Sequence, residues 1–236
     1  MPLTGVLHLI PSPLGEGNLD TVLPSEVQTL VQRLSTFIVE RPKTTRAFLK
    51  QIGHPLPLSD LEILTLDEHT GEHELPHLLV PLQAGKDVGL LSEAGAPAVA
   101  DPGGNLVRLA HKTGIVVQAH VGPSAILLAL MASGLHGQRF CFHGYLPSEK
   151  SARVQALSNI ERESREKKQT QIFIETPYRS QRLFLDILAT CNKGALLCLA
   201  VNLTTAQEFV GTRTLQAWQR ELPDITDQPT TFLLLA

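Results

Sequence analysis

Short apolar runs rich in β-branched residues alternate with segments of helical periodicity along this chain. Several of these runs, such as Val88–Leu91, are apolar at every position, as strands are when helices cover both faces of a sheet. The alternation predicts an α/β fold with largely parallel strand pairing. The clearest predicted strands are Val6–Ile10, Thr36–Val39, Val88–Leu91, Ile115–Gln118, Gln171–Ile174, Leu196–Ala200 and Thr231–Leu235.

Helices are predicted between the strands where apolar residues recur three or four positions apart, as in Ile126–Met131 and Leu183–Leu188. The charged stretch Ser148–Lys168, in which acids and bases nearly balance, predicts an exposed helix followed by a mobile loop. The composition changes near Gly134–Gly144: the loops before this segment are rich in Gly and Pro, and the charged stretch comes after it. We therefore expect two α/β domains, 1–121 and 122–236, with Gly122-Pro123-Ser124 at the hinge.

The net charge of −3 does not by itself indicate a nucleic-acid-binding protein, although a local basic patch would be enough. The best candidate is Arg41, Lys43, Arg46 and Lys50, which have no acid between them. A solvated helix face is the favoured interpretation of these cations. The three cysteines form no CxxC pair and are interpreted as small hydrophobic residues. No metal site is therefore expected.

No apolar run approaches the ~18–20 residues needed to cross a bilayer. The segment Met1–Thr4 lacks the basic start of a signal peptide. We expect a cytoplasmic protein with no membrane segment.

Three loops carry the most chemical information. In Val88–Gly103 an apolar strand runs into small residues that let the backbone approach a ligand closely, and Asp101 before Pro102 is typical of a helix start. In Val121–Ala125 a second strand runs through Gly and Pro into a helix, whose free N–H groups could hold a polar ligand group. In the third loop Glu175 ends a strand, and Arg179 could either pair with it or stay at the surface. The GxGxxG, GxxxxGK[ST] and GxSxG motifs are absent.

Taken in order, these segments resemble the tetrapyrrole methylase superfamily, and most of all its ribosomal RNA small subunit methyltransferase I branch, which 2′-O-methylates a cytidine. Ser92–Gly103 is similar in spacing to that branch's S-D-A-G-T-P-x-x-S-D-P-G, and Val121–Ala125 to its P-G-P-S-A. Phe140–Pro147 resembles its F-x-F-x-G-F-L-P, and Phe173–Arg179 its F-Y-E-S-P-H-R. The first loop, Ser12–Asp20, is similar to T-P-I-G-N-L-x-D, so the resemblance covers nearly the whole chain.

The resemblance implies two α/β domains with S-adenosylmethionine in the cleft between them, a homodimer, and ribosomal RNA or the small ribosomal subunit as a partner. Many of the contacts it implies are made by backbone atoms of small residues. The cofactor contacts it implies are Leu14, Ala96, Val99, Ser124, Ala125, Ile174, Glu175, Asn202, Leu203, Pro229 and Thr230.

If the methyl acceptor is a sugar hydroxyl, a general base helps, and the candidates are Glu93, Glu175 and Glu40, with Glu68 and His69 as a second group. Each could instead be a structural hydrogen-bond partner.

The chain also departs from the branch's pattern. Arg41 replaces an acid, and Val201-Asn202 replaces Arg-Glu. Two alternatives therefore stay open. A small-molecule methylase, for example of a tetrapyrrole, is favoured by the acidic pI and opposed by the Ser92–Gly103 loop. The other alternative is a non-catalytic protein that binds S-adenosylmethionine.

Overall fold

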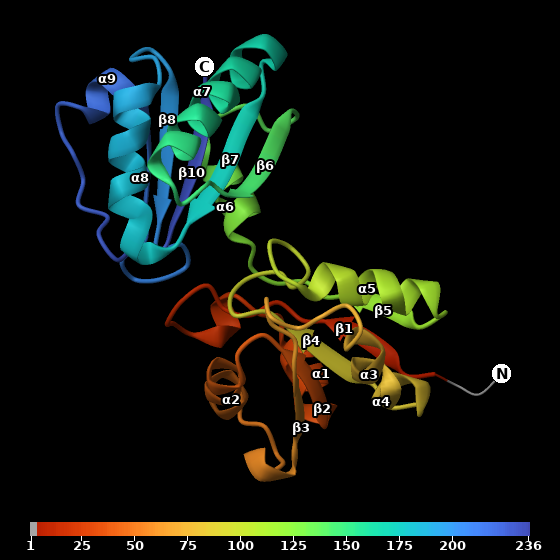
Figure 1. The fold of residues 1–236 in the computed structure, drawn as a ribbon. Helices are drawn as coiled ribbons and strands as arrows, with labels where there is room; N and C mark the ends of the chain where they lie inside the picture. Colours follow the sequence, from red (N-terminus) through yellow and green to blue (C-terminus); the bar gives the residue numbers. More distant parts are fainter. Residues whose placement is uncertain (1–3) are drawn as a thin grey trace. The chain divides into compact units, whose positions relative to one another are not determined.

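The computed structural model describes residues 4–236, so the start of the chain, Met1–Leu3, lies outside the described part. The chain divides into two compact units, residues 1–124 and 125–236, and each has its own five-stranded sheet (Figure 1). Each unit is therefore described by itself. Within residues 4–236, no helix combines the length and the apolar character needed to cross a membrane.

The sheet of the first unit is parallel throughout, with strand order β3-β2-β4-β1-β5. Its central strands are buried because their residues are apolar on both faces, as the sequence predicts. β3 is an edge strand with exposed Glu62 and Thr65 at its ends, and the sequence did not reveal it. The strands are β1 Val6–Leu9, β2 Thr36–Val39, β3 Glu62–Thr65, β4 Val88–Leu91 and β5 Val116–Ala119.

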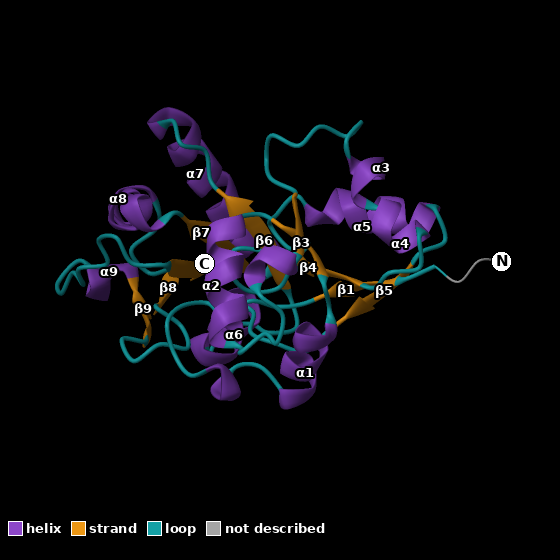
Figure 2. Ribbon diagram, turned by 90° about the horizontal axis from the view of Figure 1, so that it is seen from below, coloured by secondary structure: helices purple, strands orange, loops and turns teal. Residues whose placement is uncertain are grey.

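Helices lie on both faces of this sheet (Figure 2). Each face has its own apolar core. Ile10, just after β1, packs on one side with α1 and α2, whereas Leu7 packs on the other with α3, α4 and α5. This is the alternation expected of a strand covered on both faces. The helices are α1 Ser25–Arg33, α2 Pro42–Gln51, α3 Leu75–Leu78, α4 Val80–Gln83 and α5 Gly103–Lys112, with short 3₁₀ turns at Leu19–Thr21 and Leu58–Asp60.

The sheet of the second unit has the order β6-β7-β10-β8-β9 and is mostly antiparallel. Only β6 and β7 pair in parallel, so the prediction of largely parallel pairing is wrong for this unit. The reason is connectivity, because no helix separates β8 from β9, and a direct connection produces antiparallel neighbours. The strands are β6 Phe140–Tyr145, β7 Thr170–Glu175, β8 Leu196–Val201, β9 Phe209–Thr214 and β10 Thr230–Leu235.

Helices α7 and α8 pack on one face of this second sheet, around a core that includes Phe173, Phe184 and Trp218. Helix α6 lies on the other face, where the Thr212 hydroxyl of β9 donates a hydrogen bond of 2.7 Å to the carbonyl of Ser133. The helices are α6 Ala125–Ser133, α7 Lys150–Lys167, α8 Pro177–Thr190 and α9 Leu215–Trp218.

Helix α7 differs from its prediction in two respects. It is not simply exposed, because Leu157 and Ile160 belong to the core and the Arg153 side chain is 3% exposed. Arg153 forms an ion pair with Asp186 at 2.6 Å and donates to two backbone carbonyls. The expected mobile loop is also missing, since β7 begins at Thr170 directly after a short turn.

Candidate functional site

In the first unit, the loops that follow β1 and β4 are joined by hydrogen bonds at the carboxyl edge of the sheet. Ser12 and Gly95 exchange two backbone hydrogen bonds of 2.9 Å. The Ser12 hydroxyl also donates to the carbonyl of Ser92 at 2.9 Å. A β-carbon added to Gly95 would lie 3.2 Å from the side chain of Leu14, so Leu14 lies against this loop. Ligands bind at this edge in α/β sheets.

The loop after β4 is strained. Gly95 has φ 75°, and Ala98 and Ala100 have φ 65° and 63°, in a region that costs a non-glycine residue about 1–2 kcal/mol. The carboxylate of Asp101 holds the loop in this shape. It accepts hydrogen bonds from the backbone N–H of Ala98 at 2.9 Å and of Gly103 at 2.7 Å. A helix does start here, as predicted, but one residue later than expected: Pro102 and not Asp101 is the N-cap, and α5 begins at Gly103.

Burial raises the pKa of Asp101 to about 6, and the negative charge of Glu40 adds to the rise. The hydrogen bonds from Gly103 and Ala98 oppose it, because they favour the charged carboxylate. Asp101 therefore changes its charge near neutral pH inside a strained loop, which is a property typical of functional sites.

Glu40 and Glu93, two of the predicted base candidates, lie together at this edge. The backbone N–H of Glu93 donates to the Glu40 carboxylate at 3.3 Å. Arg41, the residue that departs from the family pattern, pairs with Glu93 at 3.2 Å, and both side chains are exposed. The Arg41 charge thus offsets one of the two carboxylates and leaves both accessible.

In the second unit, the strand register brings the predicted residues to one edge of the sheet. Thr230 at the start of β10 pairs with Glu175 at the end of β7 and with Val201 at the end of β8. Asn202 follows β8 in a left-handed conformation with φ 49°. Its N–H donates to the carbonyl of Pro229 at 3.0 Å. Ile174 and Leu203 lie next to these residues in the chain.

Glu175 forms an ion pair with Arg179, which decides between the two alternatives that the sequence left open. The distance is 2.6 Å, and the Glu175 side chain is 1% exposed. The same carboxylate oxygen accepts the N–H of Thr176 at 2.8 Å. A buried carboxylate held in this way anchors the end of β7 and the start of α8, and it is poorly placed to take a proton from a substrate.

The second group of base candidates follows β3, the neighbour of β2, at the same edge of the sheet. Glu68 and His69 are 3.7 Å apart, and both side chains are more than four-fifths exposed. His69, His73 and His77 recur every four residues, and His73–His77 reads H-E-L-P-H, an HExxH spacing that on a helix is typical of a zinc site. Only His77 lies in a helix, and in residues 4–236 no group of three or more His, Cys, Asp or Glu side chains could hold a metal ion.

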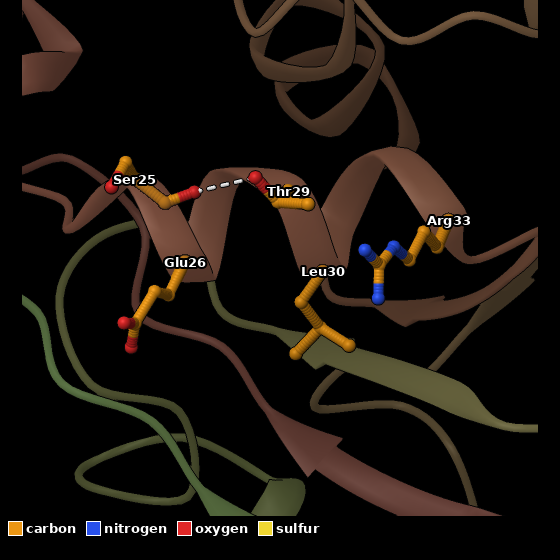
Figure 3. A pocket seen from close by; sticks show the side chains of 5 residues that line it. All are labelled: Ser25, Glu26, Thr29, Leu30 and Arg33. Carbon is orange, nitrogen blue, oxygen red and sulfur yellow. Dashed lines mark hydrogen bonds between the residues drawn. The ribbon is translucent and has the colours of Figure 1, made fainter.

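A surface hollow lies on α1 in the first unit and shares no residue with the predicted site (Figure 3). The Thr29 hydroxyl, at its rim, donates within the helix to the carbonyl of Ser25 at 2.9 Å. The hollow is lined by Ser25, Glu26, Thr29, Leu30 and Arg33.

Comparison with known proteins identifies the class to which this fold and these loops belong. The chain belongs to the family of tetrapyrrole (corrin/porphyrin) methylases, whose model matches residues 30–218. It is therefore a methyltransferase that depends on S-adenosylmethionine, as the sequence motifs predict.

Individual relatives give a narrower comparison. The chain is 33% identical to the ribosomal RNA small subunit methyltransferase I of Escherichia coli O157:H7, over 87% of this chain and 68% of the relative. It is also 33% identical to the protein of that name from Haemophilus influenzae, over 95% of this chain and 76% of the relative.

A solved structure supports the fold. The crystal structure of the methyltransferase CobJ matches with a TM-score of 0.65 at 20% identity, over 98% of this chain and 94% of that one. The predicted fold class is confirmed.

Sequence reasoning missed the role of Ser12, which joins two loops that are 80 positions apart. It also missed the strain at Ala98 and Ala100. No local pattern marks either feature, since alanine carries no signal for a left-handed conformation. The assignment of the individual cofactor contacts stays a prediction.

Proposed function

We propose that this chain transfers a methyl group from S-adenosylmethionine to a ribose 2′-hydroxyl of small-subunit ribosomal RNA. The observation that carries the proposal is the strained loop Gly95–Asp101 at the sheet edge, in a chain that is 33% identical to two methyltransferases named for this RNA. Action on ribosomal RNA is also consistent with the expected cytoplasmic location.

The residues of this loop fit the cofactor. Gly95, Ala96 and Ala98 leave room for close approach of a ligand to the backbone, and Val99 is 47% exposed although it is apolar. An exposed apolar side chain beside small residues suits an adenosine group. We propose that Leu14, Ala96 and Val99 in the first unit, and Ser124, Ala125, Ile174, Glu175, Asn202, Leu203, Pro229 and Thr230 further along, contact S-adenosylmethionine.

Bound S-adenosylmethionine supplies an electrophilic methyl group on a sulfonium, and this chain aligns the acceptor with it. A hydroxyl is a poor nucleophile while it is protonated, so a carboxylate that accepts its proton helps. Glu40 and Glu93 are the better base candidates because both are accessible at the strained loop. Glu175 instead holds Arg179 and fixes the end of β7.

Calorimetric titration with S-adenosylmethionine and S-adenosylhomocysteine tests the cofactor step. Micromolar binding is expected, and Ser124→Trp should abolish it by filling the space beside the cofactor. Unchanged affinity in that variant would remove Ser124 from the cofactor contacts.

Methyl transfer to small ribosomal subunits from methylase-deficient cells tests the acceptor. We expect labelled methyl in the RNA, at a ribose 2′-oxygen. Glu40→Gln and Glu93→Gln, assayed separately, identify the base as the one whose loss lowers kcat and removes the acidic limb of the pH–rate profile.

A small-molecule methylase is the second candidate, because the matched family is named for corrins and porphyrins and the chain is acidic overall. Methyl transfer to a tetrapyrrole without transfer to RNA would establish it. Cofactor binding without transfer to either acceptor would point to a non-catalytic S-adenosylmethionine-binding protein.

We also propose a homodimer. In α6, Leu127 and Met131 are 54% and 80% exposed, and α6 is apolar all round, which is unusual for a helix that covers a sheet with only one of its faces. Sedimentation of the wild-type chain should give a dimer. Met131→Glu should shift it toward monomer if this face is the contact, and an unchanged dimer would exclude the face.

A further inference from the structure

Helix α2 carries a row of cations on its exposed side. Lys43, Arg46 and Lys50 are spaced three and four residues apart, so they lie on one face over two helical turns, about 10 Å along the axis. All three are exposed, whereas Thr45, Phe48 and Leu49 turn toward the core. We call these three cations the basic stripe.

The basic stripe is electrostatically unfavourable for the isolated helix. Like charges at these spacings cost a few tenths of a kcal/mol per pair. Lys43 lies in the first turn, where the helix dipole disfavours a cation, whereas Lys50 lies in the last turn, where the dipole favours one. Helix α2 has no acid in its first turn, and none of the three cations forms an ion pair within residues 4–236. Repulsion between neighbouring cations that no acidic side chain relieves is a mark of function.

The stripe starts at the strained loop. Helix α2 begins directly after Glu40 and Arg41, and these residues contact Glu93 at the carboxyl edge of the first sheet. From there the stripe follows the helix away from the loop. If a polyanion places one of its repeating groups at the strained loop, the negative charges of the groups next to it lie along α2.

We propose that the basic stripe binds the phosphate backbone of the RNA that flanks the methylated nucleotide. This inference rests on the proposed function. Three cations in a row fit a strand that presents regularly spaced phosphates, whereas a small anionic substrate would need only one of them. The contacts are with phosphates, so they position the RNA without reading its sequence.

Another helix of the same unit provides a matched control. Arg46 and Lys50 on α2 are an exposed Arg–Lys pair four residues apart, and Arg108 and Lys112 on α5 have the same spacing and exposure. The α5 pair lies over the opposite face of the sheet, and in both pairs the Lys lies in the last turn of its helix, so the dipole acts on the two pairs alike. Replacing either pair with Gln removes the same charge.

The experiment measures binding of protein-free small-subunit RNA by the full chain between 50 and 200 mM KCl. If both cations contact phosphates, Arg46→Gln with Lys50→Gln should reduce the slope of log K against log salt by about 1.4, and adding Lys43→Gln by about 2 in total. The KM for RNA should rise in parallel. The affinity for S-adenosylmethionine should stay within twofold, which shows that the variants are folded.

The α5 variant should retain the wild-type slope. Equal slopes for the α2 and α5 variants, or a wild type that shows no salt-dependent RNA binding, would overturn the proposal. Failure of the proposed function has a different signature, because it is the absence of methyl transfer to small subunits by the wild type. If the chain binds RNA through the basic stripe but transfers no methyl group to small subunits, the proposed binding surface is supported and the proposed reaction is refuted.

Discussion

Replacement of Asp101 by Asn should remove a pH dependence from the stability of the first unit. Asp101 holds the strained loop through the N–H groups of Ala98 and Gly103, and its folded pKa is raised from 3.8 to about 6, mainly by burial. Asn keeps the shape and one acceptor oxygen but cannot ionise. A comparison of Asp with Asn therefore isolates the cost of the buried charge.

The sign follows from proton linkage. Between pH 3.8 and about 6 the folded state binds more protons at Asp101 than the unfolded state does, so the stabilising contribution is complete below pH 3.8 and is lost as pH rises through about 6. Each pKa unit corresponds to 1.36 kcal/mol, so between pH 4.5 and 7.5 the wild type should lose about 2 kcal/mol relative to Asp101→Asn.

Urea unfolding followed by far-UV circular dichroism at pH 4.5, 6.0 and 7.5 measures this difference. Tryptophan fluorescence does not report on the first unit, because the one tryptophan, Trp218, lies in the second. Glu40→Gln provides a second variant, since it removes a charge that raises the Asp101 pKa and should make the wild-type pH dependence shallower. If the curves of the wild type and Asp101→Asn run parallel across this range, the carboxylate is not destabilised by burial and the reasoning is wrong.

Three further predictions concern other parts of the chain. Gly95→Ala places a β-carbon 3.2 Å from Leu14 at φ 75°, so it should cost about 1 kcal/mol and weaken S-adenosylmethionine binding in calorimetry; unchanged affinity would contradict the cofactor role of this loop. Arg153→Met strands the carboxylate of Asp186 and should cost about 3–5 kcal/mol in urea unfolding, whereas a loss below 1 kcal/mol would mean that the ion pair is dispensable. Burial lowers the pKa of His8, so the free energy of unfolding should fall as pH drops below 6.5. His8→Gln should make this fall shallower, and the same dependence on pH in the wild type and the variant would exclude His8 as its source.

The sequence predicted every strand inside the two sheets and one of the four edge strands. All seven predicted strands overlap an observed strand; six lie inside a sheet, where a strand must be apolar to be covered, and the seventh is the edge strand β5, which is exposed but begins with two valines. The three missed strands, β3, β6 and β9, all lie at sheet edges. An edge strand has one neighbour and buries less surface, so its residues are free to be polar, as in Glu62–Thr65. Periodicity alone could not have separated these segments from loops.

For the site, the sequence indicated contacts between residues that are close in the chain and missed contacts between residues that are far apart. The Asp101 helix start and the Glu175–Arg179 pair both join residues within four positions of each other, and the sequence indicated both. The bonds between Ser12 and the loop of Ser92 and Gly95 join segments that are far apart in sequence. Such contacts depend on strand order, because β1 and β4 are neighbours only in the folded sheet. The order of strands in the sheet cannot be derived from the local patterns of a single sequence.

The position of β10 has a consequence for synthesis on the ribosome. This strand, Thr230–Leu235, lies at the centre of its sheet, between β7 and β8, although it is translated after both. Until its residues have left the exit tunnel, β7 and β8 have no partner on that side, and apolar residues such as Phe173 and Leu199 stay uncovered. The first unit, whose last strand ends at Ala119, can close its sheet well before that point. The nascent chain therefore passes through a stage in which the first unit can be complete while the sheet of the second is still open.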